Sequence, residues 1–574
     1  MFWVRQAVLM LLLCGLAHAQ SNPGFIEGAV LCANTGCSTQ QPVNPLGLNQ
    51  AFMAKQDLNA GLGIGSGVSV VSFGGADPTG AVDATVAFQT TVNKVATNGG
   101  GCVLVPVGTF SISGTITFPS LAGLCGSGLG SHIIGTGPSG QVLFSIGDGT
   151  TNPKNLVFEN VYVSFSQQQS AGSAFRLRNG HNIYLRNILT YGANTYTSIQ
   201  METGAINAQY GYFVDHVELD YGSYGIVIGD NVNPTVQEVW INDSIIAGDP
   251  AVTPIMQAGI SIRNGSGMYG KNVSILKADR GIEIIPTTGQ LAKGINFNGY
   301  IVDTNASYGL LIAPTASGQV YANQFTGLWA VSTKNGPGIS IAAGLQSSNN
   351  VFTGCIIAVN GQQGVFLQGG SFTTFSNCHV ADNSVLGSAM YPGYEIAANV
   401  SYFTIVGGVA GSMPVFGGNN QSYGIKIDNG NSDHFQITGV NFETNVTGPL
   451  ISGAAGLDIF IVAPHVSELV DNAPMGQSIL KLAAPNNTSA GANLQLFGDG
   501  ATNPAKTVRV HGGVFQIINN AYSAPILSLT DAGALTVTAG IAATLPTTPP
   551  SGTGTVNMVC VDTLGNFYAK AACP

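Results

Sequence analysis

A repeated strand phrase in the first half of the chain predicts a column of ionisable side chains. The phrase occurs at Phe158–Val161, Leu185–Ile188 and Val214–Val217, with an outward residue second in each copy. Because successive side chains of a strand point to opposite faces, stacking the copies brings the second residues to one outward-facing position. The column predicted in this way contains Glu159, Arg186, Asp215, Asn242 and Lys271.

Two carboxyl groups near this column could act on a sugar. Asp215 and Asp243 are expected on adjacent coils, with Arg186 or Lys271 available to orient a uronate. A retaining glycosidase needs two carboxyl groups about 5 Å apart, and an inverting one about 6.5–9.5 Å. Aromatic side chains in the same stretch are expected to pack against sugar rings: Tyr191, Tyr210, Tyr212, Tyr221, Tyr224 and Trp240.

A purely structural interpretation of the same residues stays open. Opposite charges on neighbouring strands stabilise a sheet by roughly 0.2–1 kcal/mol per pair, and tyrosine is common in strands. Histidines are too few for a zinc site. The segment 428–433 offers oxygen ligands for calcium but also fits a polar corner. No cofactor is expected, except Ca²⁺ if the protein is a lyase.

A second repeated phrase, Gly-apolar-X-apolar, predicts the strands that position these residues. Its spacing of about 22–34 residues is typical of a stacked solenoid, and its alternation is typical of short strands with one buried face. The full copies lie at Gly225–Ile228, Gly259–Ile262, Gly281–Ile284, Gly309–Ile312, Gly338–Ile341, Gly364–Leu367 and Gly424–Ile427.

Composition and the N-terminal segment limit which partners and which cellular compartment fit this chain. Only 8 % of the 574 residues are charged, and the net charge is −10. A chain without a Lys/Arg-rich run argues against nucleic acid and anionic lipid as partners. Arg5, the apolar run 7–16 and Ala17-His18-Ala19 fit a secretory signal cut after Ala19. The protein is therefore expected to be secreted, extracellular or periplasmic, with no membrane span.

Eight cysteines remain after removal of such a signal, an even number that suits an oxidising compartment. The second and third pairs of near neighbours are each 23 residues apart, about one coil. Two reduced cysteines stacked in the core are the alternative for such a pair. The disulfides predicted from proximity are Cys32–Cys37, Cys102–Cys125, Cys355–Cys378 and Cys560–Cys573.

One N-terminal block resembles the capping module of the pectate-lyase superfamily. The matching residues are Phe73-Gly74, Asp77, Gly80, Asp83, Gly99 to Gly101 and Pro106 to Phe110, while Ala84 and Phe110 depart from the pattern. Asp83 is placed as the N-cap of a helix over 84–96. The resemblance implies an all-β, right-handed single-stranded parallel β-helix with an N-terminal capping helix, and carbohydrate as the partner.

The chain divides into six parts by these criteria. They are a signal peptide (1–19), an irregular segment (20–66), the capped β-helix (67–465), a β-rich region (466–543), a Pro/Thr/Gly linker (544–554) and a small C-terminal hairpin (555–574).

Two classes of function remain. The first is a secreted enzyme that cleaves a polysaccharide by hydrolysis or by β-elimination at a uronate. The second is a non-catalytic β-helix that binds glycan or builds a tailspike-like or adhesin-like fibre, with a homotrimer as the expected assembly. The family's Asp-Asp, Gly-His-Gly and Arg-x-Pro-x-x-Arg sets are missing, which favours the second class. The concentrated charge and aromatic residues favour the first, toward which the balance leans slightly.

Overall fold

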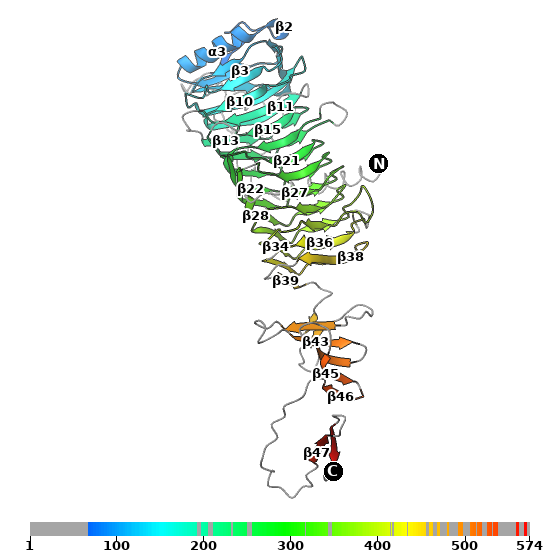
Figure 1. Ribbon diagram of the computed structural model, residues 1–574. Coiled ribbons are helices and arrows are strands. Elements are labelled where there is room, and N and C mark those ends of the chain that lie inside the picture. Colours follow the sequence, from blue (N-terminus) through cyan, green and yellow to red (C-terminus); the bar gives the residue numbers. More distant parts are fainter. Residues whose placement is uncertain are drawn as a thin grey trace, which may run out of the picture.

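The computed structural model describes residues 67–454 with short gaps, and the strands beyond them up to residue 570. The gaps are 192–196, 205–209, 231–233, 250–254, 316, 343–346, 414, 416–417, 419, 433 and 443. Most of the described chain is a stack of short strands with one helix at its N-terminal end (Figure 1). None of the helices in this described part has the length and apolar character needed to cross a membrane.

The N-terminal end is closed by the helix α3 (Thr85–Thr97), which follows β1 (Val68–Ser69) and β2 (Thr79–Asp83). Phe88, Val92 and Val95 form its buried face. The N-cap is Ala84 and not Asp83, so that expectation was wrong by one position. The Asp83 carboxylate nevertheless accepts the backbone N–H of Thr85 at 3.1 Å, which ties down the first turn.

The Gly-apolar-X-apolar phrases form one sheet, called sheet B, of thirteen strands within the described residues. Its strands are all parallel, and the second residue of each phrase falls in one inward row, as in Ile226, Ile260 and Ile282. The strands are β5 (Ile116–Phe118), β8 (Val142–Ile146), β10 (Ser173–Arg178), β12 (Thr197–Glu202), β15 (Tyr224–Ile228), β18 (Ala258–Ile262), β21 (Arg280–Ile284), β24 (Tyr308–Ile312), β27 (Ile339–Ile341), β30 (Val365–Leu367), β33 (Tyr394–Ile396), β36 (Tyr423–Gly430) and β38 (Gly448–Ala454).

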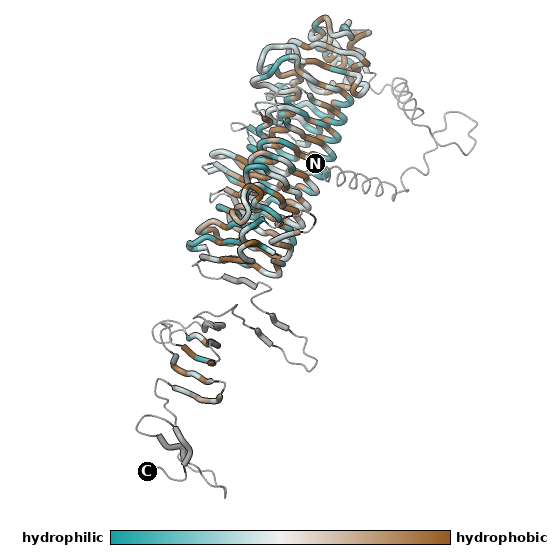
Figure 2. The backbone as a smooth tube through the Cα atoms, turned by 90° about the vertical axis from the view of Figure 1, so that its right-hand side faces the viewer, coloured by the Kyte–Doolittle hydropathy of each residue, from teal (hydrophilic) through white to brown (hydrophobic). Residues whose placement is uncertain are grey.

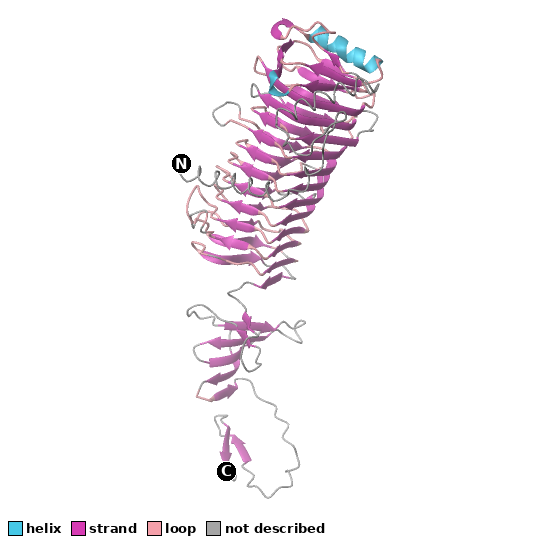
Figure 3. Ribbon diagram, turned by 180° about the vertical axis from the view of Figure 1, so that it is seen from behind, coloured by secondary structure: helices cyan, strands magenta, loops and turns pink. Residues whose placement is uncertain are grey.

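The remaining strands of each coil belong to a second parallel sheet, called sheet A, which bends at a corner. Before the corner lie β3 (Gly101–Val105), β6 (Ala122–Gly126), β9 (Lys154–Phe165), β11 (His181–Tyr191), β13 (Tyr210–Asp215), β16 (Val236–Asn242), β19 (Gly265–Lys271), β22 (Leu291–Asn298), β25 (Gln319–Thr326), β28 (Ser347–Thr353), β31 (Thr373–Ser376), β34 (Phe403–Val406), β37 (Phe435–Thr438) and β39 (Ile459–Val462). After it lie β4 (Gly108–Ile112), β7 (Ser131–Gly135), β14 (Glu218–Asp220), β17 (Ile245–Ala247), β20 (Ser274–Leu276), β23 (Ile301–Asp303), β26 (Trp329–Val331), β29 (Ile356–Ala358), β32 (His379–Ala381) and β35 (Val409–Gly411), while β9 and β11 run through the corner. Figure 3 shows the strands stacked coil on coil.

The corner of sheet A has a left-handed backbone. Only residues that tolerate positive φ are comfortable there, with glycine best and Asn, Asp and His next. Successive coils place Asn160, Asn187, His216, Asp243, Asn272, Gly299, Gly327 and Gly354 at this position, all with φ between 48° and 64°.

The core is a continuous column of inward side chains. Phe325, Phe352 and Phe375 stack on one another with ring centroids 4.7–5.0 Å apart. Apolar and polar segments alternate along successive coils (Figure 2). Stacking of like residues in register follows from the parallel pairing, because each inward position meets its equivalent one coil later.

Of the predicted disulfides, Cys102–Cys125 is present, with Cα atoms 5.8 Å apart. Cys355 and Cys378 are free and buried, so the prediction of a bridge between them was wrong and the alternative of two stacked thiols holds. The hydrogen bond to Cys378 and burial raise the pKa of the Cys355 thiol, which keeps it protonated. The other two predicted pairs, Cys32–Cys37 and Cys560–Cys573, lie outside the residues whose side chains are described.

The strands beyond residue 467 pair antiparallel, in contrast to the coils. They are β40 (Glu468–Val470), β41 (Ile479–Lys481), β42 (Ala492–Leu496), β43 (Lys506–His511), β44 (Val514–Ile518), β45 (Pro525–Thr530), β46 (Leu535–Val537), β47 (Met558–Val561) and β48 (Phe567–Lys570).

Candidate functional site

The ionisable column is in register. Arg186 pairs with Glu159 on one side and Asp215 on the other, and Asn242 and Lys271 follow on the next two coils. These side chains share the outward face of sheet A just before the corner. The strand phrase therefore predicted the placement of all five residues.

Asp215, His216 and Asp243 form a compact cluster at the corner. One ligand atom from each lies within 4.8 Å of the others. His216 Nδ1 is 3.1 Å from Asp215 Oδ1, and these two side chains are 61 % and 44 % exposed. The amide of Asn272 donates to Asp243 Oδ1 at 2.8 Å. His216 and Asp243 both occupy the left-handed corner, where His216 is exposed and Asp243 is half-buried.

The other charged members of the column are engaged differently. Arg186 forms an ion pair with Glu159, so its guanidinium is already neutralised. Lys271 lies two coils beyond Asp215, roughly 10 Å along the axis. The structure thus brings Asp215 and Asp243 together, and it places Glu159 with Arg186.

The cluster offers two carboxylates and an imidazole to a metal ion. Calcium takes six to eight oxygen ligands, of which these residues supply few, whereas mixed nitrogen and oxygen ligands suit transition metals better. At the segment 428–433, Asp428 is paired with Lys426 at 2.8 Å, and Asp433 lies outside the described residues.

An aromatic row runs beside the ionisable column, two residues earlier on each strand. Tyr184 stacks on Phe213 and Phe213 on Trp240, both with centroids 4.5 Å apart, and Trp240 stacks on Tyr269 at 5.5 Å. Both faces of Trp240 are therefore covered by neighbouring rings. A sugar approaching this row meets ring edges, except at its two ends.

A second group of side chains lies just after the corner. Tyr191 and Tyr221 meet edge to face at 4.8 Å. Burial, together with the charge of Glu218, raises the pKa of Asp220 to about 6. A carboxyl group that titrates this near neutrality has the property required of a general acid. Sequence patterns place Asp220 near the cluster but carry no signal of its desolvation.

The predicted aromatic set is divided by the fold. Tyr210 is exposed at the start of β13 and contacts His181. Tyr212 is fully buried, and its hydroxyl donates to the Glu202 carbonyl, so its assignment to substrate binding was wrong. The two-residue period of β13 turns it inward together with Val214. Tyr224 lies on sheet B, beneath the Arg263 guanidinium, and does not join the sheet A cluster.

Sequence reasoning missed a charged network on the outward face of sheet B. Glu202, whose side chain is 3 % exposed, is held by Arg176 and Arg178. Further along, the buried Glu283 pairs with Arg280 at 2.6 Å. The outward X position of the Gly-apolar-X-apolar phrases points to only two members of this network, Arg176 and Glu283.

Two family models match overlapping parts of the chain. One, described as "Rhamnogalacturonase A/epimerase, pectate lyase-like", covers residues 67–283. The other, "Right handed beta helix region", covers residues 258–460. Residues 67–460 form a right-handed parallel β-helix whose N-terminal part is pectate-lyase-like.

Solved structures resemble this β-helix at the level of the fold. The mannuronan C-5 epimerase AlgE4 A-module of Azotobacter vinelandii is 16 % identical over 68 % of this chain and 99 % of its own, with a TM-score of 0.45. Tailspike protein 3 of bacteriophage CBA120 is 15 % identical over 84 % and 70 %, with a TM-score of 0.48. The adhesin PfbA of Streptococcus pneumoniae is 15 % identical over 69 % and 100 %, with a TM-score of 0.37. No curated protein sequence matches this β-helix.

Proposed function

We propose that this β-helix is secreted, binds a polysaccharide along the outward face of sheet A and cleaves it beside Asp215 and Asp243. The observation that carries the proposal is the proximity of the two carboxylates, with ligand atoms within 4.8 Å on an exposed corner. Hydrolysis of a glycosidic bond needs two carboxyl groups: one protonates the leaving oxygen and the other attacks the sugar or activates water.

The short separation makes a specific prediction about stereochemistry. Retaining enzymes hold their carboxyl groups about 5–5.5 Å apart, whereas inverting enzymes leave about 6.5–9.5 Å for a water molecule. The Asp215–Asp243 arrangement is close to the retaining spacing. In this proposal His216 fixes the orientation of the Asp215 carboxyl, and Asn272 fixes that of Asp243.

The family description of the N-terminal half supports a polysaccharide as the substrate, since it names a rhamnogalacturonase and a pectate-lyase-like fold. β-Elimination at a uronate is the other cleavage that fits. In this version of the proposal Lys271, two coils from Asp215, binds the uronate carboxylate.

A non-catalytic glycan-binding function is the second candidate, and one observation favours it. Each carboxylate of the column and the corner cluster already has a protein partner: Glu159 has Arg186, Asp215 has His216, and Asp243 has Asn272. Such pairing is what a structural or binding face needs, because it leaves no carboxylate poised for proton transfer.

The test incubates the protein with acidic and neutral polysaccharides and follows reducing ends together with the ultraviolet absorbance of unsaturated uronates. Reducing ends alone indicate hydrolysis, and both signals together indicate elimination. Asp215→Asn and Asp243→Asn should each abolish the activity. Asp428→Asn is the control: it removes a carboxylate of sheet B, away from the cluster, and should leave the activity unchanged. Binding without cleavage over the whole panel would sink the enzyme and leave the glycan-binding protein.

A further inference from the structure

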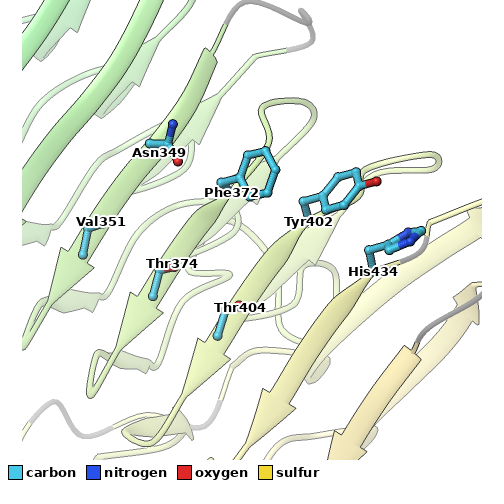
Figure 4. A pocket seen from close by; sticks show the side chains of 7 residues that line it. All are labelled: Asn349, Val351, Phe372, Thr374, Tyr402, Thr404 and His434. Atoms are coloured by element: carbon cyan, nitrogen blue, oxygen red, sulfur yellow. The ribbon is translucent and has the colours of Figure 1, made fainter.

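A hollow of about 330 Å³ opens on the outward face of sheet A, on later coils than the carboxylate cluster (Figure 4). Its volume falls in the range of small-molecule sites. Two rows of side chains line it, from β28, β31 and β34 and from the turns before β31, β34 and β37. These residues are Asn349, Val351, Phe372, Thr374, Tyr402, Thr404 and His434.

Two bulky residues strain the backbone at the edge of the hollow. Phe372 and Tyr402 have φ of 52° and 56°, and His434, a residue type that tolerates this region better, has a φ of 49°. Most equivalent positions of earlier coils are held by Asn or Gly, which take this conformation readily, although Glu238 and Ala322 also occupy it. Strained residues of this kind persist where they serve a function. Here the strain turns aromatic rings outward.

The rings form an exposed, overlapping surface. Phe372 and Tyr402 have centroids 5.0 Å apart, and Tyr402 and His434 4.7 Å. Phe372 is 55 % exposed and Tyr402 42 % exposed. Large exposed aromatic side chains grouped in a hollow mark a binding surface.

Polar groups complete the lining. Thr374 and Thr404 lie side by side in register with Val351, next to the row of rings. Two threonine hydroxyl groups, the Asn349 amide and the His434 imidazole offer donors and acceptors, and none of the residues lining the hollow is Lys, Arg, Asp or Glu. This combination suits a sugar ring, whose C–H face packs on aromatic carbon while its hydroxyls exchange hydrogen bonds. It does not suit a uronate.

We infer that the hollow binds an uncharged sugar unit of the polysaccharide that the carboxylate cluster acts on. The inference rests on the proposed function for the identity of the polymer. The two sites lie on one face, because the row of Tyr269 continues through Asn296 and Gln324 to Val351. Four coils separate β16 from β28, roughly 19 Å along the axis. A chain lying along this polar row would reach both sites.

The experiment is native gel electrophoresis in gels containing dextran, xylan or galactomannan, and in parallel polygalacturonate or alginate. Phe372→Asn and Tyr402→Asn remove the ring and place a residue that accepts positive φ. We expect retardation in at least one uncharged gel, with the apparent Kd about tenfold higher in each variant. The unfolding temperature of the variants should equal or exceed that of the wild type, because the strain is relieved.

A structural role for the rings predicts the reverse: a lower unfolding temperature and unchanged retardation, which would overturn the inference. Thr374→Val and Thr404→Val keep the strands and remove only the hydroxyls, so they test the hollow even if an Asn variant fails to fold. Phe73→Ala, which removes another exposed ring at the N-terminal cap, is the control and should bind as the wild type does.

The same gels separate this inference from the proposed function. Asp215→Asn should abolish cleavage and keep retardation. If the wild type and the Phe372→Asn and Tyr402→Asn variants are retarded equally, sugar binding in the hollow is overturned and the proposed function is not. Absence of retardation and cleavage of the wild type with every polysaccharide overturns both.

Discussion

The side-chain amide of Asn272 donates a hydrogen bond to the carboxylate of Asp243, 2.8 Å away, from the same left-handed corner one coil later. Asn187 donates to Asn160 in the same way at 3.2 Å. On the coils between these two contacts the corner position is held by ionisable residues, His216 and Asp243, instead of asparagine. The candidate site therefore uses corner positions that other coils use for amide contacts.

His216→Asn should keep the fold and weaken cleavage. Asparagine accepts positive φ, so the corner is unstrained, but the contact of the imidazole with Asp215 at 3.1 Å is lost. Because this contact orients the Asp215 carboxyl, we expect kcat to fall by roughly tenfold with little change in KM, whereas loss of the carboxyl itself in Asp215→Asn should cost about 10²–10⁴-fold. Unchanged kcat in His216→Asn would assign His216 to the corner alone.

Asn187→Ala and Asn187→Gly should differ in stability. Alanine loses the contact to Asn160 and is strained at the φ of 51°, at a cost of about 1–2 kcal/mol. Glycine loses the same contact without strain. Denaturant unfolding of the two variants measures the difference. Equal midpoints would show that the positive φ at this corner imposes no measurable cost on alanine.

Asp220→Asn should change the pH dependence of stability. The pKa of Asp220 is raised from 3.8 to about 6, by burial and then by Glu218. The folded protein holds this proton more tightly than the unfolded chain does. The stability from Asp220 is thus complete below about pH 4 and lost as the pH rises to about 6.

Relative to the wild type, Asp220→Asn should gain about 1–2 kcal/mol in unfolding free energy between pH 4 and pH 7, after allowance for solvent screening. Parallel denaturant curves at the two pH values provide the measurement. Glu218→Gln, which removes the neighbouring charge, should give a smaller gain. No difference between wild type and Asp220→Asn across this range would contradict the raised pKa.

Loss of the Cys102–Cys125 bridge should destabilise the N-terminal end. The bridge closes a segment of 23 residues, for which chain entropy gives about 3 kcal/mol. The double variant Cys102→Ser/Cys125→Ser should unfold at lower denaturant. Limited proteolysis should then begin in the cap, and cleavage that starts elsewhere would speak against this placement.

Cys355 and Cys378 should resist alkylation in the native protein and react fully after unfolding. Both thiols are buried, and the pKa of Cys355 is raised, whereas alkylation requires an accessible thiolate. Mass spectrometry of peptides alkylated before and after denaturation reads each residue separately. Recovery of the two peptides as a disulfide-linked pair would contradict the free thiols.

The register of sheet A could be predicted from the sequence because two constraints agreed. The strand alternation fixed which face Glu159 and Asp215 occupy, and the corner residues that follow them fixed the phase from coil to coil. The prediction for Tyr212 was wrong because it rested on residue type alone. Tyr212 is two residues from the inward Val214, and strand alternation therefore places it on the inward face as well.

Other parts of the site depend on contacts that no local pattern contains. The raised pKa of Asp220 comes from desolvation between coils. The covering of Trp240 comes from Phe213 and Tyr269. The hollow requires positive φ at Phe372 and Tyr402, which residue propensities alone argue against.

The distance between successive corners is set by backbone hydrogen bonds, at about 4.8 Å, and is independent of the side chains displayed there. The corner therefore presents its side chains at a fixed interval along the axis. A linear polymer whose repeat matches a whole number of these intervals meets each displayed group in phase, while a polymer of another repeat drifts out of phase within a few units. Selectivity for chain geometry can thus arise from the stacking itself, before any single side chain distinguishes one sugar from another.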